Sequence, residues 1–124
     1  MCIRDRYYDA QVAATRTLVD TSSGSTPSAD ELRVAAETVE RMQLDAAERA
    51  ELATEILERA LSSLHDGSLK PDSGVSLFRS SLTEEALREG LERSYRDMAR
   101  YAPDPAQKIA LIDRANKVRP VSLL

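Results

Sequence analysis

The sequence predicts an all-α domain of about five helices arranged as antiparallel hairpins, and three observations support this fold class. Of the 124 residues, 42% are hydrophobic and 31% are charged, whereas only 4% are aromatic. This composition favours helix over sheet. Apolar side chains recur at helical spacing along most of the chain, and residues that cap helices stand before these segments. A chain of this length has room for one core, so we expect a single domain.

The composition also excludes several classes of function. The formal net charge is −4, so we expect neither nucleic acid nor a membrane surface as a partner. The longest apolar run is far shorter than the roughly 20 residues that span a bilayer, and no secretory signal is recognisable, which predicts a cytoplasmic protein. The one cysteine, Cys2, and the one histidine, His65, cannot build a zinc site by themselves. We therefore expect no metal.

The first six residues, MCIRDR, are interpreted as an artefact. Codons for residues 1–6 resemble the transposase mosaic-end adapter that is used in fragment sequencing libraries, and such segments are excluded from fold arguments. On this interpretation the natural part of the chain covers residues 7–124, and it is a fragment of a larger protein. The alternative is an ordinary charged N-terminus.

Capping residues and apolar periods predict the first three helices. The first covers residues 7–20 and ends at a Ser, Gly and Pro-rich segment. The second begins after Ser28, which forms a capping box with Glu31, and the third begins after Asp45. The apolar stripe of the third helix covers about half its circumference, so we expect it to contact neighbours on two sides. Gly67 marks its end.

Residues 68–81 are predicted to form a long loop. The segment contains Pro, Gly and five Ser and shows no sustained hydrophobic period. Its apolar residues, Val75, Leu77 and Phe78, are expected to pack back onto the helices.

Two further helices follow this segment. Thr83 caps the fourth, and Gly90 lies beside its apolar stripe, where a small residue lets another element come close. The alternative for Gly90 is a tolerated defect that costs about 1 kcal/mol relative to Ala. Asp104 and Pro105 begin the fifth helix, and Pro120 ends it.

A short connection joins the second predicted helix to the third, and another joins the fourth to the fifth. Such short connections require two antiparallel hairpins. The first helix is then left unpaired. An unpaired helix is expected where a helical-repeat array has been cut, because each repeat buries its open face on a neighbour.

The last predicted helix has an amide in its apolar stripe. That stripe consists of Ile109, Leu111, Ile112, Ala115 and Val118. Asn116 falls on the same side, which predicts a buried amide bonded to a neighbouring helix. If it is buried and bonded, Asn116→Ala costs about 1 to 3 kcal/mol. Our hypothesis is that Asn116, Lys117 and Arg119 secure this helix and close the array; the alternative for the two cations is that they complement the helix dipole.

A second candidate surface lies on the second predicted helix. Arg33, Glu37 and Arg41 share one side of it and are candidates for lining a peptide groove; the alternative is a solvated face of mixed charges. We find no catalytic residues, since no nucleophile stands with a base, and no phosphate-binding glycine loop or kinase segment is present. His65 is interpreted as a helix-end residue that complements the dipole. No cofactor is expected in this fragment.

The order of segments resembles the C-terminal tetratricopeptide-repeat (TPR) region of the bacterial serine/threonine protein kinase G family. The resemblance rests on LIDRANKVRPVSLL at the end, LREGLERSYRDMARYAPDPAQKIAL before it, and ELRVAAETVERMQL and AELATEILERALSSL further back. It covers residues 7–124. The general repeat pattern is poorly kept, because Trp is absent, the hairpins differ in length and residues 68–81 form an insertion.

The resemblance implies a short TPR-like solenoid that is not itself catalytic. In that family it follows a rubredoxin-like metal domain and a kinase domain, which uses ATP and Mg²⁺ to phosphorylate a small forkhead-associated-domain regulator of glutamate and 2-oxoglutarate metabolism. The implied partners are the parent's own kinase domain, a second copy of the chain, and a protein substrate or peptide. The alternative hypothesis is a free-standing TPR-like adaptor that binds a partner peptide, and a third hypothesis is a small helical enzyme.

Overall fold

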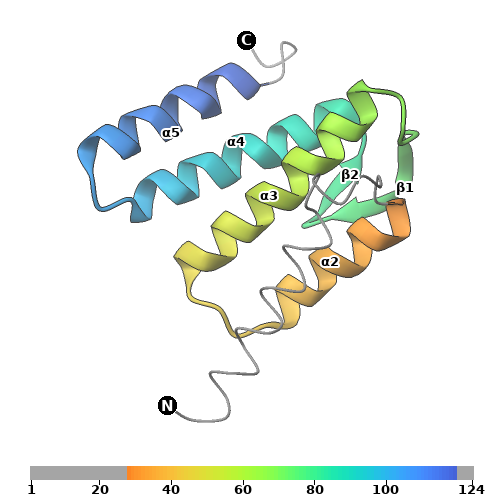
Figure 1. Ribbon diagram of the computed structural model, residues 1–124, viewed down its shortest axis with the longest axis horizontal. Helices are drawn as coiled ribbons and strands as arrows, with labels where there is room; N and C mark the ends of the chain where they lie inside the picture. The colour runs from red at the N-terminus through yellow and green to blue at the C-terminus, as the bar shows by residue number, and fades with distance from the viewer. Residues whose placement is uncertain (1–27, 120–124) are drawn as a thin grey trace.

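The computed structural model describes residues 28–119 and shows four helices and one small β-hairpin (Figure 1). In chain order these are α2 (Ala29–Arg41), α3 (Ala46–His65), β1 (Asp72–Leu77), β2 (Ser80–Leu82), α4 (Glu84–Tyr101) and α5 (Pro105–Val118). The helices lie side by side in the order in which they follow one another in the chain. The all-α prediction is confirmed. The predicted helix over residues 7–20 lies outside the described residues.

The helices begin where the capping residues predict. Ser28 and Glu31 form the predicted capping box: the Glu31 N–H donates to Ser28 Oγ at 3.2 Å, and the Ser28 N–H donates to Glu31 Oε1 at 3.4 Å. Asp45, Thr83 and Asp104 each accept a hydrogen bond from a backbone N–H in the first turn of α3, α4 and α5, respectively. Such caps satisfy donors that a helix leaves free at its start, and thereby fix where it begins.

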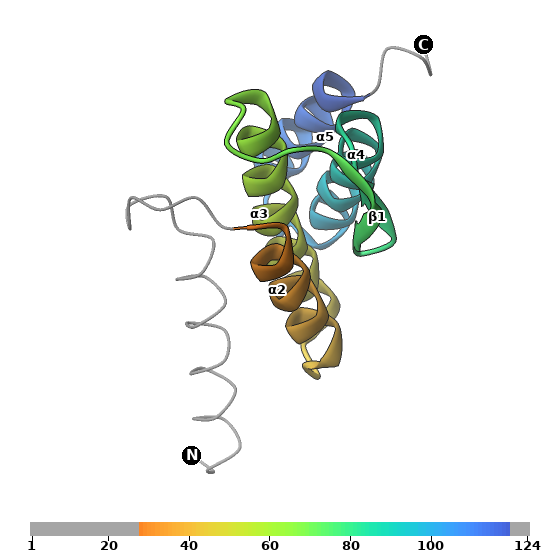
Figure 2. The same cartoon turned by 90° about the vertical axis from the view of Figure 1, so that its right-hand side faces the viewer.

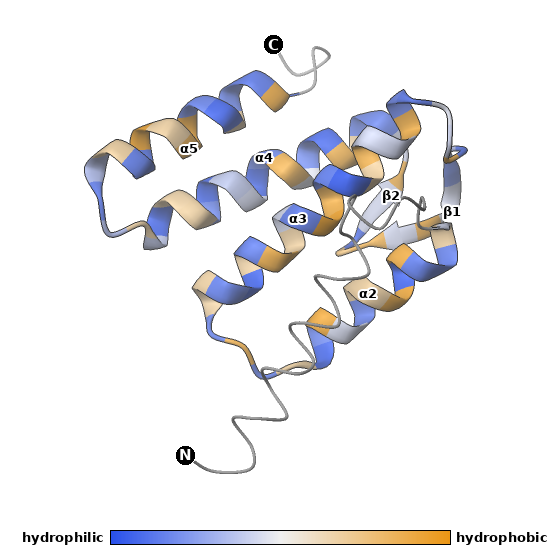
Figure 3. Cartoon of the chain, viewed as in Figure 1, coloured by the Kyte–Doolittle hydropathy of each residue, from blue (hydrophilic) through white to orange (hydrophobic). Residues whose placement is uncertain are grey.

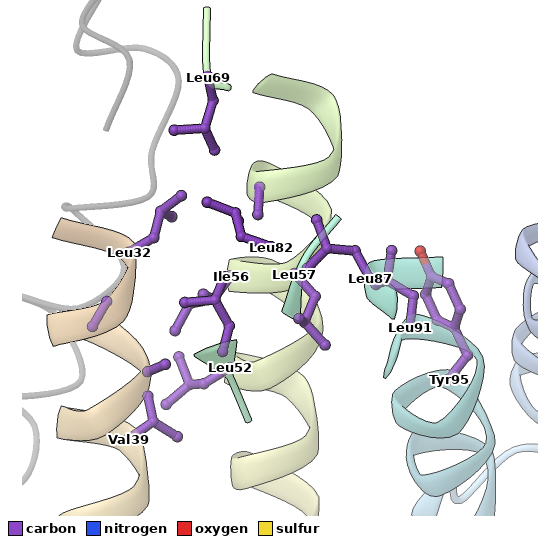
Figure 4. Packing of buried hydrophobic residues seen from close by; sticks show 14 of the residues in the cluster. Leu32, Val39, Leu52, Ile56, Leu57, Leu69, Leu82, Leu87, Leu91 and Tyr95 are labelled. Carbon is purple, nitrogen blue, oxygen red and sulfur yellow. The ribbon is translucent and has the colours of Figure 1, made fainter. Parts of the chain in front are cut away.

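The core is aliphatic and centres on α3. Most of its buried side chains come from α2, α3, the hairpin and α4, and α5 contributes Ala115. Figure 4 shows the cluster extending from Leu32 on α2 to Tyr95 on α4. α3 contacts both α2 and α4, as its wide apolar stripe predicts. Leu52, Ile56 and Leu57 are all at most 1% exposed, and burying side chains of this size stabilises the fold by about 1.5 to 3 kcal/mol each.

The prediction of a loop over residues 68–81 is wrong, because this segment contains the antiparallel hairpin of β1 and β2. The hairpin lies at the end of the helix row where α3 ends and α4 begins (Figures 1 and 2). β1 contacts α2 and β2 contacts α4. Leu77 and Leu82 are fully buried, so the hairpin closes the core where two neighbouring helices alone would leave it open.

The turn between the two strands holds two residues in left-handed backbone geometry. Leu77 pairs with Ser80, and the residues between them, Phe78 and Arg79, have φ values of 52° and 70°. This is the backbone of a type I′ turn, whose twist matches that of the strands but which favours Asn and Gly. Neither residue here is Asn or Gly, so the turn stores backbone strain.

Candidate partner-binding surfaces

Asn116 is exposed, which corrects the prediction of a buried amide. Its Oδ1 accepts a hydrogen bond of 3.0 Å from Arg96 Nη2 on α4. Of the whole predicted stripe on α5, only Ala115 is buried, whereas Ile109 and Ile112 are 69% and 38% exposed. The cost of about 1 to 3 kcal/mol for Asn116→Ala was expected only for a buried amide, so it does not apply to this exposed one.

Asn116 nevertheless joins a group of side chains that links α5 to α4. Arg96 donates to Glu92 Oε2 at 3.0 Å, and Arg119 Nε lies 3.9 Å from the same oxygen. Arg88 donates to the carbonyl of Val118 at 3.4 Å, near the end of α5. Exposed pairs of this kind contribute about 0 to 1 kcal/mol each. They fix the position of the end of α5 more than they stabilise the fold.

Lys117, the third residue that we expect to secure the last helix, does not contact α4 through an ion pair. Lys117 pairs with Asp113 on its own helix at 3.5 Å. The structure thus brings Asn116 and Arg119 to α4 but leaves Lys117 on the outside of α5. Whether the three residues close a repeat array stays a prediction.

Arg33, Glu37 and Arg41 lie together along α2 and pair with one another. Arg33 Nη1 is 3.1 Å from Glu37 Oε1, Arg41 Nη2 is 3.7 Å from Glu37 Oε2, and Arg33 also reaches Asp30 at 3.5 Å. Their charges are therefore mutually compensated along the helix. A partner role for these three residues also stays a prediction.

His65 connects the two helical hairpins, a contact that the sequence reasoning missed. Its Nε2 lies 3.1 Å from Glu84 Oε1, in the first turn of α4, and Arg88 Nε donates to the same oxygen at 3.1 Å. The hydrogen bonds from His65 and Arg88 lower the pKa of Glu84 below its ordinary value. No local sequence pattern predicts this contact, because 19 residues separate His65 from Glu84.

A second tie between the hairpins joins Tyr95 of α4 to Glu58 of α3. The Tyr95 hydroxyl donates to Glu58 Oε1, while the residue as a whole is 8% exposed and belongs to the core. Burial, followed by the hydrogen bond to the carboxylate, raises the pKa of Tyr95 far above its ordinary value. The hydroxyl therefore remains a hydrogen-bond donor at physiological pH.

A groove of about 540 Å³ opens between α3 and α4. Its floor consists of Ala50, Ala53, Leu57 and Gly90, which are buried, and Phe78 from the strained turn lines it as well. The charged side chains on the groove belong to Arg49, Arg93, Asp97 and Arg100. The sequence reasoning did not find this groove. The small residues on α3 and α4, Gly90 among them, were its only sequence signal.

The structure offers no group of three or more metal-ligating side chains within residues 28–119. In the same part of the chain, no helix has the length and apolar character needed to cross a membrane.

Comparison with known proteins identifies the family. The family model described as "Protein kinase G tetratricopeptide repeat" matches residues 4–122, which is nearly the whole chain. The chain belongs to this family. The match overlaps part of the segment 1–6 that we interpret as adapter, and that interpretation stays a prediction.

Two members of the protein kinase G family are similar to the chain along most of its length. The serine/threonine-protein kinase PknG of Mycolicibacterium smegmatis is 32% identical over 113 residues, which is 91% of this chain and 14% of that protein. PknG of Mycobacterium leprae is 30% identical over 115 residues, 93% of this chain and 15% of that protein. The chain thus spans about a seventh of the length of the curated relatives it matches.

Proposed function

We propose that this chain is the non-catalytic TPR region of a cytoplasmic PknG-type serine/threonine kinase and that it acts as a scaffold and self-association module. In this proposal a kinase domain elsewhere in the parent protein binds ATP and Mg²⁺, and the helical region supports that domain and holds copies of the protein together. Membership of the protein kinase G TPR family supports the first part. The exposed face of α5 supports the second.

The observation that carries self-association is the apolar side of α5. Ile109 is 69% exposed and Ile112 is 38% exposed, and they lie one helical turn apart on α5. Figure 3 shows apolar segments along this helix, which is the last of the described row. In solenoid proteins a terminal repeat that faces water carries a polar outer face, and an apolar one requires a neighbour. Contiguous exposed apolar side chains mark interaction surfaces more generally. We infer that a second copy covers this side of α5.

Light scattering coupled to size-exclusion chromatography tests the self-association. We expect the molar mass of the 124-residue chain to rise with concentration, and the variant with Ile109→Ser and Ile112→Ser to remain monomeric, because the substitutions remove the apolar contact. Val34→Ser is the matched control, since Val34 is an exposed hydrophobic residue on α2 (49% exposed). A wild-type chain that is monomeric at every concentration would contradict the proposal.

The source DNA tests the link to a kinase. We would amplify and sequence the DNA immediately upstream of the Tyr7 codon without the library adapter. An in-frame kinase domain supports the proposal. A start codon at that point would instead favour the alternative, a free-standing TPR-like adaptor.

A further inference from the structure

The groove between α3 and α4 has a length that suits a peptide. Its lining runs from Ala46 to Leu57 on α3 and from Gly90 to Tyr101 on α4. At 1.5 Å per residue each stretch rises by about 16 Å, which equals about five residues of an extended chain. The volume of about 540 Å³ lies within the range of ligand sites. The groove therefore fits a short peptide segment.

The two ends of the groove differ in character. α3 and α4 run antiparallel (Figure 1). Leu57 lies near Gly90 at one end of the groove, and the start of α3 at Ala46 and the end of α4 at Tyr101 belong to the other end. The first end is apolar and small-residue-rich, with the half-buried Phe78 beside it. This end suits one bulky apolar side chain of a ligand.

Cationic side chains line the groove from about one helical turn beyond Gly90 to its other end. Arg49, Arg93 and Arg100 face one carboxylate, that of Asp97. Within residues 28–119, Arg93 and Arg100 form no ion pair, and the side chain of Arg49 donates only to the carbonyl of Met42, at 3.4 Å. Five other arginines in the same part of the chain are paired with carboxylates: Arg33, Arg41, Arg88, Arg96 and Arg119.

These charges stand out against the rest of the molecule. The whole chain carries a formal net charge of −4, so an acidic partner is repelled by the molecule in general and attracted only where cations collect. Guanidinium groups bind carboxylates through paired, charge-assisted hydrogen bonds. The arginines along the groove therefore provide a binding place for an acidic ligand. A polyanion such as nucleic acid, by contrast, would meet the chain's overall negative charge.

We propose that this groove binds an acidic peptide segment of a partner protein, in which a bulky apolar residue stands a few positions away from Asp or Glu. The apolar residue lies between Leu57, Gly90 and Phe78, and the carboxylates meet Arg93 and Arg100. The spacing follows from the groove, since α4 rises by about 10 Å between Arg93 and Arg100. This site is separate from the α5 surface and adds a second kind of partner to the scaffold.

Selection from a phage-displayed library of random octapeptides tests the proposal. The 124-residue chain serves as the target, and the variant with Arg93→Gln and Arg100→Gln serves for counter-selection. We expect the enriched peptides to combine an aromatic or large aliphatic residue with at least one Asp or Glu at the proposed spacing. Enriched peptides without an acidic residue, peptides that bind both proteins equally, or an absence of enrichment would each overturn the proposal.

Fluorescence anisotropy with the most enriched peptide then measures the affinity. The Arg93→Gln, Arg100→Gln variant should bind at least about tenfold more weakly, whereas a control with Lys108→Gln and Arg114→Gln, which removes the same charge from α5, should bind as the wild type does. Raising the NaCl concentration from about 0.1 M to about 1 M shortens the Debye length from about 10 Å to about 3 Å and should weaken binding. Equal loss of affinity in both variants would overturn the groove as the site.

Two controls separate this proposal from the other causes of a lost signal. Thermal unfolding followed by circular dichroism shows whether each variant retains its fold, which we expect because Arg93 and Arg100 are exposed. The variant with Ile109→Ser and Ile112→Ser should bind the peptide normally. Failure of self-association would thus leave the groove intact, and failure of peptide binding would leave the α5 surface intact.

Discussion

Gly90 allows α4, β2 and α3 to meet, because it places no side chain between them. A Cβ atom at this position would lie 2.6 Å from Ser80 Oγ and 3.4 Å from Leu57 Cδ1. Ser80 is 4% exposed, and its hydroxyl finds no hydrogen-bond partner in residues 28–119. The glycine is thus required by close approach, as its place beside the apolar stripe predicts, although the approaching element is a strand as well as a helix.

A double-mutant cycle at Gly90 and Ser80 tests this requirement. In the Ser80→Ala background, Gly90→Ala should raise the free energy of unfolding by about 1 kcal/mol, because Ala is the better helix former and the contact at 2.6 Å to Oγ is gone. In the wild-type background the same substitution should give no gain, since Ser80 must shift within the core. Urea denaturation measures both. An equal gain in the two backgrounds would show that Gly90 is only a tolerated defect.

Asn116 shows why a candidate residue can be found in sequence while its role is missed. Helical periodicity correctly places it beside Ile109 and Ile112, but periodicity cannot say whether a neighbour covers that side. Here no described element covers it, and the amide meets Arg96 at the surface. The groove arginines were missed for a related reason: Arg49 and Arg93 lie on different helices, and only packing brings them together.

The helices and the hairpin differ in how far sequence predicts them. Each described helix begins with a local capping interaction, such as the hydrogen bond from the Glu48 N–H to Asp45 Oδ1 at 2.8 Å. The sequence therefore predicts the first residues of these four helices closely. The hairpin lacks such signals. β2 has only three residues, β1 carries a bulge between Asp72 and Ser76, and the turn has Phe and Arg where Asn and Gly are usual. Burial of Leu77 and Leu82 against the helices overrides these local preferences.

The strained turn of the hairpin makes a prediction at Arg79. Arg79→Gly should raise the free energy of unfolding by about 0.5 to 1 kcal/mol, because glycine adopts positive φ without the cost of about 1 to 2 kcal/mol that a Cβ atom brings, less its own entropy cost. Arg79 is exposed, so no packing is lost. Arg79→Ala is the control: it retains the Cβ atom and should change stability little. Chemical denaturation compares the three proteins, and equal effects of Gly and Ala would exclude backbone strain.

At the scale of the whole molecule, the described helices form two hairpins that pack together along α3 and α4. The α2–α3 hairpin meets the α4–α5 hairpin at the α3–α4 contact, where Tyr95 donates to Glu58. His65 and Glu84 connect the same two helices where α3 ends and α4 begins. The groove lies along this contact. The same packing that joins the hairpins therefore also shapes the proposed peptide site.

The contacts of Glu84 with His65 and Arg88 make the free energy of unfolding depend on pH. Hydrogen bonds from His65, then Arg88, lower the pKa of Glu84 from its ordinary value of 4.5 in the folded chain. A carboxylate whose folded pKa is lowered stabilises the fold fully above its ordinary pKa, and this stabilisation is lost as the pH falls through the lowered pKa. The contribution of Glu84 should therefore be present at neutral pH and disappear in acid.

Thermal unfolding of Glu84→Gln between pH 7 and pH 3 measures this contribution. Glutamine is neutral throughout, so we expect the variant to have a lower Tm than the wild type at pH 7 and the difference to shrink below about pH 4.5, where the wild-type carboxyl begins to lose its charge. Glu89→Gln is the control, because Glu89 is exposed on the same helix and forms no ion pair within residues 28–119. A difference in Tm that stays constant over this range would show that Glu84 acts through its shape or hydrogen bonding alone. If the Tm difference from the wild type shrinks in acid for Glu84→Gln but not for Glu89→Gln, the charge of Glu84 stabilises the contact between the two hairpins.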